Sequence, residues 1–570
     1  MRARIAVGCW LAAALVPGIA HAERILLIPL DSRPAAGHFA QMIGAMSDVQ
    51  FETPPADLLG RFTTPGQPER LMEWLKAQDF SDVTAVIAST DMIAFGGLIA
   101  SRTDQTTLEQ AVQRIRAFVE FRRTKPKARF YGYSAVTRLT PTATKSTAAW
   151  RLQLGRYAEI KERYRQGPTP ALLQSMRNLL AKIPPMEIQR YDAVRERNHE
   201  LQKSLLRLTA QGALDYIVFG QDDAQPMGPH VPETQRLRAM TAQLSIPGRV
   251  YFCEGIDQHA NVLLSRALLR ARNWLPRIRV VFSDEAGRKR IADYESKTVD
   301  ESLRDQLLAS GARPAAEGQE YDYSLYLNVP KRAETPFQRF LEDLTSEVDQ
   351  GFPVGVADIN IAKDGTADSE LFEALDQNRR LVRLLSYAGW NTAGNTMGTS
   401  IPAANVYLLA RRSESNPLVR ELALREFLLH RIVNDFSYHR YVRPQAYKII
   451  DANPMASREE TYGSAFAEVD DFVRRELTHH VMETFRGQFL GQRFFAGSKQ
   501  YEITGLDDLK ISLPWPRAYE VRIEFKMQAR ELTSIGNVAI RWPGIAVERV
   551  IRVARQGAMA VAADWAVDRP

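Results

Sequence analysis

The stretch RILLIPLDSR, residues 24–33, shows the pattern that recurs along most of the chain. An apolar run of strand-forming residues leads directly into the polar residues Asp31, Ser32 and Arg33. Similar runs alternate with amphipathic stretches, for example 107–121, 233–244 and 261–271. The predicted strands are 24–30, 83–89, 129–134, 216–220, 249–254, 279–283, 323–328, 354–358 and 384–387. Alternating strands and helices predict an α/β fold, with a parallel sheet covered by helices.

The number of predicted strands favours a (β/α)-barrel-like core. We expect residues 23–276 and 331–440 to form this core, with a smaller α/β lobe at 277–330. A single open α/β sheet is the alternative, because strand spacing does not show whether the first and last strands pair.

The pattern changes at about residue 441. Residues 519–527 alternate strictly between apolar and charged side chains, as in a half-buried antiparallel strand. Together with the runs 494–503 and 537–542, they predict a small β-domain within residues 441–570, preceded by a helical segment. Such a domain either caps the core or binds sugar.

The first 22 residues have the three parts of a secretory signal: a basic start, an apolar run at 5–16, and Ala20-His21-Ala22. The apolar run is shorter than the roughly 20 residues that a membrane-spanning helix needs. We therefore expect cleavage after Ala22 and a periplasmic or secreted protein with no integral membrane segment. Cleavage removes Cys9 and leaves Cys253 alone, so no internal disulfide can form.

The composition is that of a folded globular chain, with 45% hydrophobic and 25% charged residues and a net charge of +7. Residues 145–207 hold thirteen Lys and Arg against six Asp and Glu, in a stretch with helical spacing. This basic region is either a solvated helix face or a docking face for an acidic glycan or a membrane surface. No motif indicates nucleic acid binding.

Polar residues follow nearly every predicted strand, and parallel α/β folds bring such residues together at one edge of the sheet. The candidates for substrate binding here are Asp31, Arg33, Asp91, Arg138 and Asp257. Each aspartate taken alone also fits a helix N-cap.

Asp222 and Asp223 follow the fourth predicted strand and are the candidate catalytic residues. We expect a turn that lets both carboxylates reach one cleft, where their repulsion favours the protonated form of one of them. Glycoside hydrolases typically use two carboxylates. In a substrate-assisted mechanism, Asp222 would orient an acetamido group and Asp223 would act as general acid and then base. The alternative is a turn followed by an N-cap.

The stretch WNTAGN, residues 390–395, is a second candidate for sugar binding. The indole of Trp390 suits an apolar sugar face, and the amides of Asn391 and Asn395 suit hydroxyl groups. The alternative is that Trp390 belongs to the core and Asn391 caps a helix.

A metal site formed by His230, Asp257 and His259 with Asp222 or Asp223 is a further possibility, although no metal-binding motif such as HExxH supports it. The sequence has no GxSxG motif, and Cys253 lies in an apolar strand, so Ser or Cys nucleophiles are not indicated. No cofactor is implied.

Four motifs resemble those of the domain-of-unknown-function family 4127 (DUF4127). They are LLIPLDSRP at 26–34, STDMIAFGGLIASR at 89–102, QDDAQP at 221–226 and AGWNTAGNTMG at 388–398. The chain departs from the expected Asp-Glu pair at Asp257-Gln258. The resemblance implies no chemistry, because the family label records none. The layout of the predicted site is also loosely similar to that of retaining β-N-acetylhexosaminidases.

These features predict a periplasmic glycoside hydrolase that acts on an N-acetylated sugar through two carboxylates. Its expected partner is a carbohydrate substrate. A metal-dependent hydrolase and a non-catalytic carbohydrate-binding protein are the two alternatives.

Overall fold

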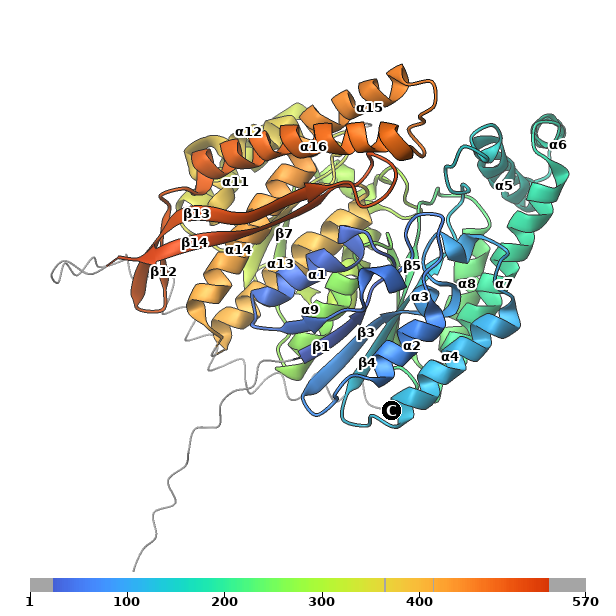
Figure 1. The fold of residues 1–570 in the computed structure, drawn as a ribbon, viewed down its shortest axis with the longest axis horizontal. Coiled ribbons are helices and arrows are strands. Elements are labelled where there is room, and N and C mark those ends of the chain that lie inside the picture. The colour runs from blue at the N-terminus through green and yellow to red at the C-terminus, as the bar shows by residue number, and fades with distance from the viewer. Residues whose placement is uncertain (1–23, 363–364, 414, 533–570) are drawn as a thin grey trace, which may run out of the picture.

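The computed structural model describes residues 24–362, 365–413 and 415–532. The predicted signal peptide and the predicted strand at 537–542 lie outside these residues. The described chain forms two parallel sheets with helices around them and a three-stranded antiparallel sheet near its C-terminal end (Figure 1). The predicted α/β class and the C-terminal β-sheet are therefore confirmed.

The first sheet has six parallel strands in the order β2-β1-β3-β4-β5-β6. They are β1 (Arg24–Ile28), β2 (Gln50–Glu52), β3 (Val83–Ser89), β4 (Arg129–Val136), β5 (Tyr216–Gln221) and β6 (Val250–Glu254). The helices along this part of the chain are α1 (Pro34–Ala45), α2 (Pro68–Lys76), α3 (Thr90–Phe95), α4 (Leu108–Arg123), α5 (Arg151–Gln166), α6 (Pro170–Leu180), α7 (Pro185–Ala210), α8 (His230–Gln243) and α9 (His259–Ala271).

Both faces of the first sheet are buried, as the nearly continuous apolar strands require. Successive side chains of β1 point to opposite faces. Leu26 and Ile28 join a core with α2, α3, α4, α7 and α8, whereas Ile25 and Leu27 join a larger core with α1 and α9. The basic region forms α5, α6 and α7, which extend at one side of the molecule (Figure 1). The predicted helices in this region are confirmed.

The second sheet has five parallel strands in the order β11-β10-β9-β7-β8. They are β7 (Arg277–Phe282), β8 (Arg313–Pro314), β9 (Tyr323–Asn328), β10 (Val354–Asp358) and β11 (Ser386–Ala388). Its helices are α10 (Val299–Ser310), α11 (Glu334–Asp349), α12 (Ser369–Asp376) and α13 (Ala393–Arg412). Helices α9 and α13 contact each other, and both contribute to the larger core that joins the two sheets.

The barrel expected from the strand count is not formed, and the structure has two open sheets instead. After α9 the chain starts a new sheet at β7, which pairs with β8 and β9. Because β9 pairs with both β7 and β10, the expected boundary at residue 330 would divide one sheet. A repeated strand–helix pattern is common to both architectures, so it carries no information about closure.

The remaining helices are α14 (Pro417–Ile432), α15 (Arg443–Ala452) and α16 (Gly463–Thr484), with a π-helical segment at Val433–Val442. The antiparallel sheet comprises β12 (Arg493–Ala496), β13 (Lys499–Ser512) and β14 (Arg522–Glu531) in that order. Within the described ranges, every helix is too short or too polar to cross a lipid bilayer.

Gly220 in β5 allows the first sheet to approach α9 closely, and a substitution tests this packing. A Cβ atom at Gly220 would lie 2.6 Å from the Gly255 carbonyl oxygen and would also meet the ring of His259, which is completely buried. We expect Gly220→Ala to lower the free energy of unfolding by about 1–3 kcal/mol. Chemical denaturation would measure this change.

Gly487→Ala is the matched control, because a Cβ atom at Gly487 has no neighbour within 4 Å. It should leave stability unchanged or raise it slightly, since alanine is the better helix former. Equal effects of the two substitutions would contradict the close approach of β5 and α9.

Candidate active site

The carboxyl ends of the strands in the first sheet bring together seven predicted site residues, including Arg138 after β4, and one that was not predicted. Asp31 and Arg33 follow β1, Asp91 follows β3, and Asp222 and Asp223 follow β5. Asp257 follows β6, and the unpredicted residue is Arg102, from the turn Ala100–Arg102. Hydrogen bonds join Arg33 to Asp31 and Asp257, and Arg102 to Asp222. The charge of Asp222 also acts on Asp91 and Asp257.

Arg33 lies between two carboxylates. Its Nε and Nη2 donate to Asp31 at 2.9 and 2.7 Å, and its Nη2 and Nη1 donate to Asp257 at 2.7 and 3.1 Å. The Arg33 side chain is only 8% exposed. Burial raises the pKa of Asp257 to about 6, although Arg33 acts in the opposite direction. A buried guanidinium group needs hydrogen-bonded carboxylates to balance its charge. The contacts of Arg33 with Asp31 and Asp257 also connect the end of β1 to the end of β6.

The adjacent carboxylates each have a different arginine partner. Arg102 donates to Asp222, and Arg138, which follows β4, forms an ion pair with Asp223. The side chain of Asp222 is 6% exposed, whereas that of Asp223 is 26% exposed. Burial raises the pKa of Asp223, with Asp222 adding to the rise and Arg138 opposing it. Of the two acids, Asp223 is therefore the more accessible.

Asp91 lies behind the accessible part of the site. It is 3% exposed, and its Oδ2 accepts a hydrogen bond from the Ala135 amide of β4 at 2.9 Å. Burial raises its pKa to about 7, and the charge of Asp222 contributes to the increase. The Asp91 side chain is therefore placed to support the end of β4 and not to contact a ligand directly.

The structure separates the three predicted residues of the WNTAGN stretch. Trp390 is 7% exposed, its ring packs 5.4 Å from that of Phe39, and its Nε1 donates to Thr399 at 3.3 Å. Its indole therefore belongs to the core, and we do not assign it to sugar stacking. Asn395 is also buried, and its Oδ1 accepts a hydrogen bond from the Asp257 amide at 3.2 Å.

Asn391 alone of these three is partly accessible. Its backbone has a φ of 58°, and its Oδ1 accepts a hydrogen bond from the hydroxyl of Tyr519 at 2.9 Å. Tyr519 belongs to the segment between β13 and β14, so the C-terminal sheet contributes directly to the site.

This C-terminal segment was not among the predicted site residues. The Nε1 of Trp515 donates to the Ser32 hydroxyl at 3.0 Å, and the indole lies 4.9 Å from the Arg33 guanidinium carbon. Arg522 donates to the Ser32 carbonyl at 3.1 Å. Residue spacing could not have shown these contacts, because about 480 residues separate the two segments in sequence. Arg102, in contrast, lies in the polar stretch that follows the predicted strand at 83–89, so its position was a usable signal.

The histidines considered for a metal site have other contacts. His230 bonds the carbonyl of Gln225 at 2.8 Å, and His259 is fully buried beside Gly220. Burial lowers their pKa values to about 4 and about 3. Among the described residues, no three His, Cys, Asp or Glu side chains converge as metal ligands. Cys253 is buried as well, and burial raises the pKa of its thiol.

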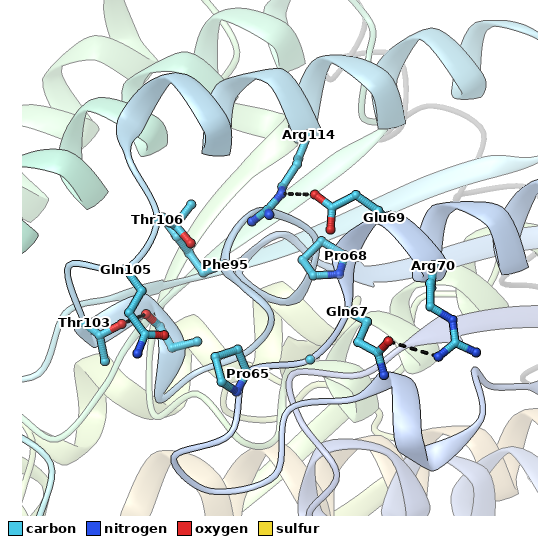
Figure 2. Close-up of a pocket in the computed structure, with 12 residues that line it drawn as sticks. Pro65, Gln67, Pro68, Glu69, Arg70, Phe95, Thr103, Gln105, Thr106 and Arg114 are labelled. Carbon is cyan, nitrogen blue, oxygen red and sulfur yellow. Dashed lines mark hydrogen bonds and ion pairs between the residues drawn. The ribbon is translucent and has the colours of Figure 1, made fainter.

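A separate cavity of ≈ 380 Å³ lies beside the segment that carries Arg102. Figure 2 shows its polar walls, including the ion pair between Arg114 and Glu69. Ala100 and Thr103 contribute to it, but none of the aspartates described above does. The acid cluster and this cavity are therefore distinct features, although residues of the turn Ala100–Arg102 contribute to both.

A model of the family described as "Protein of unknown function (DUF4127)" matches residues 25–524. The chain belongs to this family. The match extends over the two parallel sheets and includes Tyr519, so this DUF4127 chain has its whole candidate site within the family region. The predicted resemblance to the family is confirmed. Comparison with curated proteins and with solved structures gave no match.

The titration of Asp91 can be tested through stability. Its pKa in the folded chain, about 7, lies above its ordinary value of 3.8, so the protonated acid stabilises the fold at low pH. This contribution is present below about pH 4 and is lost as the pH rises through about 7. Asp91→Asn should therefore have a higher free energy of unfolding than the wild type. This advantage should be larger at pH 8 than at pH 5, by on the order of 1–3 kcal/mol.

Melting temperatures at the two pH values would measure this difference. Asp192→Asn, at an exposed position paired with Lys161, is the control and should show little dependence on pH. The same change in melting temperature at both pH values for Asp91→Asn would refute the raised pKa.

Proposed function

We propose that this protein is a glycoside hydrolase that acts on an N-acetylated sugar in the periplasm. The observation that carries the proposal is the contrast between the two adjacent carboxylates after β5. Asp222 is almost fully covered, whereas Asp223 is partly accessible and burial raises its pKa. An accessible acid with a raised pKa is suited to protonate a leaving-group oxygen.

In this proposal Asp223 is the general acid and then the general base. Asp222 uses its Oδ2 for Arg102, and we assign its Oδ1 to the acetamido N–H of the substrate. Arg138, which pairs with Asp223, and Asn391, which is partly accessible, are the polar groups that would bind sugar hydroxyls. Asp31, Arg33, Asp91 and Asp257 support the site from behind, since all four are buried.

The balance of charges favours an uncharged substrate. Arg33, Arg102 and Arg138 each form an ion pair with an aspartate, and the cluster contains five aspartates. An anionic substrate would have to compete with these carboxylates for the guanidinium groups. A neutral sugar avoids this competition and offers hydroxyl groups as both donors and acceptors.

A carbohydrate-binding protein without catalysis is the second candidate. The pairing of both adjacent carboxylates with arginines favours it, because an ion-paired carboxylate is a good acceptor for hydroxyl groups and a weaker proton donor. Sugar binding without any product, including after long incubation with the wild-type protein, would support this candidate.

Replacement of Asp223 tests the proposed acid directly. Asp223→Asn should lower the turnover of fluorogenic N-acetylhexosaminides by on the order of 10²–10⁴-fold, because the amide cannot donate the proton. Asp451→Asn removes an exposed aspartate–arginine pair in α15 and should leave turnover unchanged. Unaltered turnover in Asp223→Asn would exclude Asp223 as the acid.

The pH dependence gives a second test. The general acid must be protonated, so kcat/KM should fall as the pH rises through the pKa of Asp223. Arg138 lowers this pKa, so Arg138→Gln should raise it and move the alkaline limb of the profile to higher pH. A limb that moves to lower pH, or does not move, would contradict the role of the pair.

A further inference from the structure

We propose that α6 and the turn after it form a docking face for an anionic lipid bilayer. The face consists of Arg177, Leu180, Lys182 and Met186, and we call it the α6 face. Figure 1 shows α6 at the outer edge of the molecule, beside α5 and α7. The α6 face shares no residue with the acid cluster, so it stands or falls independently of the proposed hydrolase.

Apolar side chains of α6 are incompletely covered by the rest of the protein. The helix has five Leu and Met residues among its eleven positions and buries none of them. Helix α2 is shorter, with nine residues, yet it buries four of them. Leu180 is 37% exposed although α6 contacts α5, and Met186 in α7 is 65% exposed. Transfer of such side chains out of water is favourable, so this part of the chain retains apolar surface that a partner can cover.

Positive charge accompanies these apolar side chains without compensating acids. Residues 163–186 include four Lys or Arg and no Asp or Glu. Two of the four, Arg163 and Arg165, form ion pairs with acids of α5 at 2.6 and 3.4 Å. The other two, Arg177 and Lys182, are exposed and form no ion pair with any residue in the described ranges. The described part of the chain therefore leaves two positive charges of the α6 face unbalanced.

The charged and apolar side chains of the α6 face are close together along the chain. Arg177 and Leu180 are three positions apart in α6, so their side chains are neighbours on the helix surface. The amide of Lys182 donates to the Leu179 carbonyl at 2.9 Å, which keeps the turn on the end of α6. Met186 is the second residue of α7, directly after this turn. One partner surface can therefore contact both kinds of side chain.

An anionic bilayer is the partner that matches both properties of the α6 face. Helices that lie in a membrane interface place Lys and Arg among the headgroups and Leu or Met at the boundary of the acyl chains. A soluble polyanion would balance Arg177 and Lys182 but would leave Leu180 and Met186 in water. A second copy of the same face would bring like charges together. Contact with the bilayer is peripheral for the described chain, since none of its helices can span a membrane.

Co-sedimentation of the mature protein with lipid vesicles tests the α6 face. The probe is vesicles of phosphatidylcholine and phosphatidylglycerol in equal amounts, with vesicles of phosphatidylcholine alone as the uncharged reference. The protein should bind the anionic vesicles and not the reference. Arg177→Glu combined with Lys182→Glu should weaken this binding by about tenfold or more. Leu180→Ser combined with Met186→Ser should weaken it as well, by about threefold or more.

Arg116→Glu combined with Arg123→Glu is the matched control. Both arginines belong to α4, are exposed and form no ion pair with another described residue, and the substitutions change the net charge by the same amount. Figure 1 shows α4 well away from α6, so this control should bind like the wild type. Melting temperatures equal to that of the wild type would show that the variants are folded. If Arg177→Glu with Lys182→Glu fails to fold, Arg177→Gln with Lys182→Gln tests the same charges.

Three results would overturn the α6 face as a bilayer contact. The first is no binding of the wild type to the anionic vesicles. The second is that the charge variants of α6 and of α4 bind equally well. The third is that the Leu180 and Met186 variant binds like the wild type while dextran sulfate, a soluble polyanion, competes with the vesicles. That result would assign the face to a soluble acidic polymer.

Discussion

Burial of arginine side chains at the carboxyl edge of the first sheet is the constraint on which the rest of the structure depends. A guanidinium group does not lose its charge in a protein, so each buried arginine needs a carboxylate nearby. Arg33 is matched by Asp31 and Asp257, and Arg102 by Asp222. Removing Asp222 would leave the buried charge of Arg102 without its carboxylate partner, at a cost of about 3–5 kcal/mol.

The pairs also determine the shape of the edge. β1 and β6 are four strand positions apart in the sheet, which is roughly 19 Å at ~4.8 Å per strand on a flat sheet. Arg33 nevertheless contacts Asp257 at 2.7 Å. The loops after β1 and β6 must therefore lean toward each other over the intervening strands.

A second buried acid pair connects this edge to the other lobe. Glu254, the last residue of β6, accepts hydrogen bonds from Ser296, and Glu295 accepts one from the Gly394 amide at the start of α13. Burial raises the pKa of Glu295 to about 8, and Glu254 adds to the increase. Glu295 is therefore mostly protonated at neutral pH, which lets the two acids be buried close together. They join β6, the loop of Tyr294 and α13 into a single support.

The sequence allowed the strands, and the polar residues that follow them, to be predicted, because both depend on local patterns. Apolar runs such as 83–89 became strands with nearly the same limits, and the polar residues after them meet at one edge. The number of sheets could not be predicted, since it depends on which distant strands pair. The environment of Trp390 could not be predicted either, because the same residues suit a core or a sugar surface.

The neighbouring acids show how one dipeptide can provide two different groups. We expected a turn that presents Asp222 and Asp223 together. The amide of Asp222 still donates to the Val136 carbonyl of β4, and the chain bends at Asp223. Each acid pairs with a different arginine, although the charge of Asp222 still acts on Asp223.

Arg102 comes from the segment after β3 and covers Asp222, whereas Arg138 comes from the end of β4 and leaves Asp223 partly open. The next amide, that of Ala224, donates to the Tyr294 carbonyl, which fixes the chain directly after Asp223. The difference in accessibility between the two acids therefore follows from which segment supplies the arginine partner of each acid. It does not require any difference between the two side chains themselves.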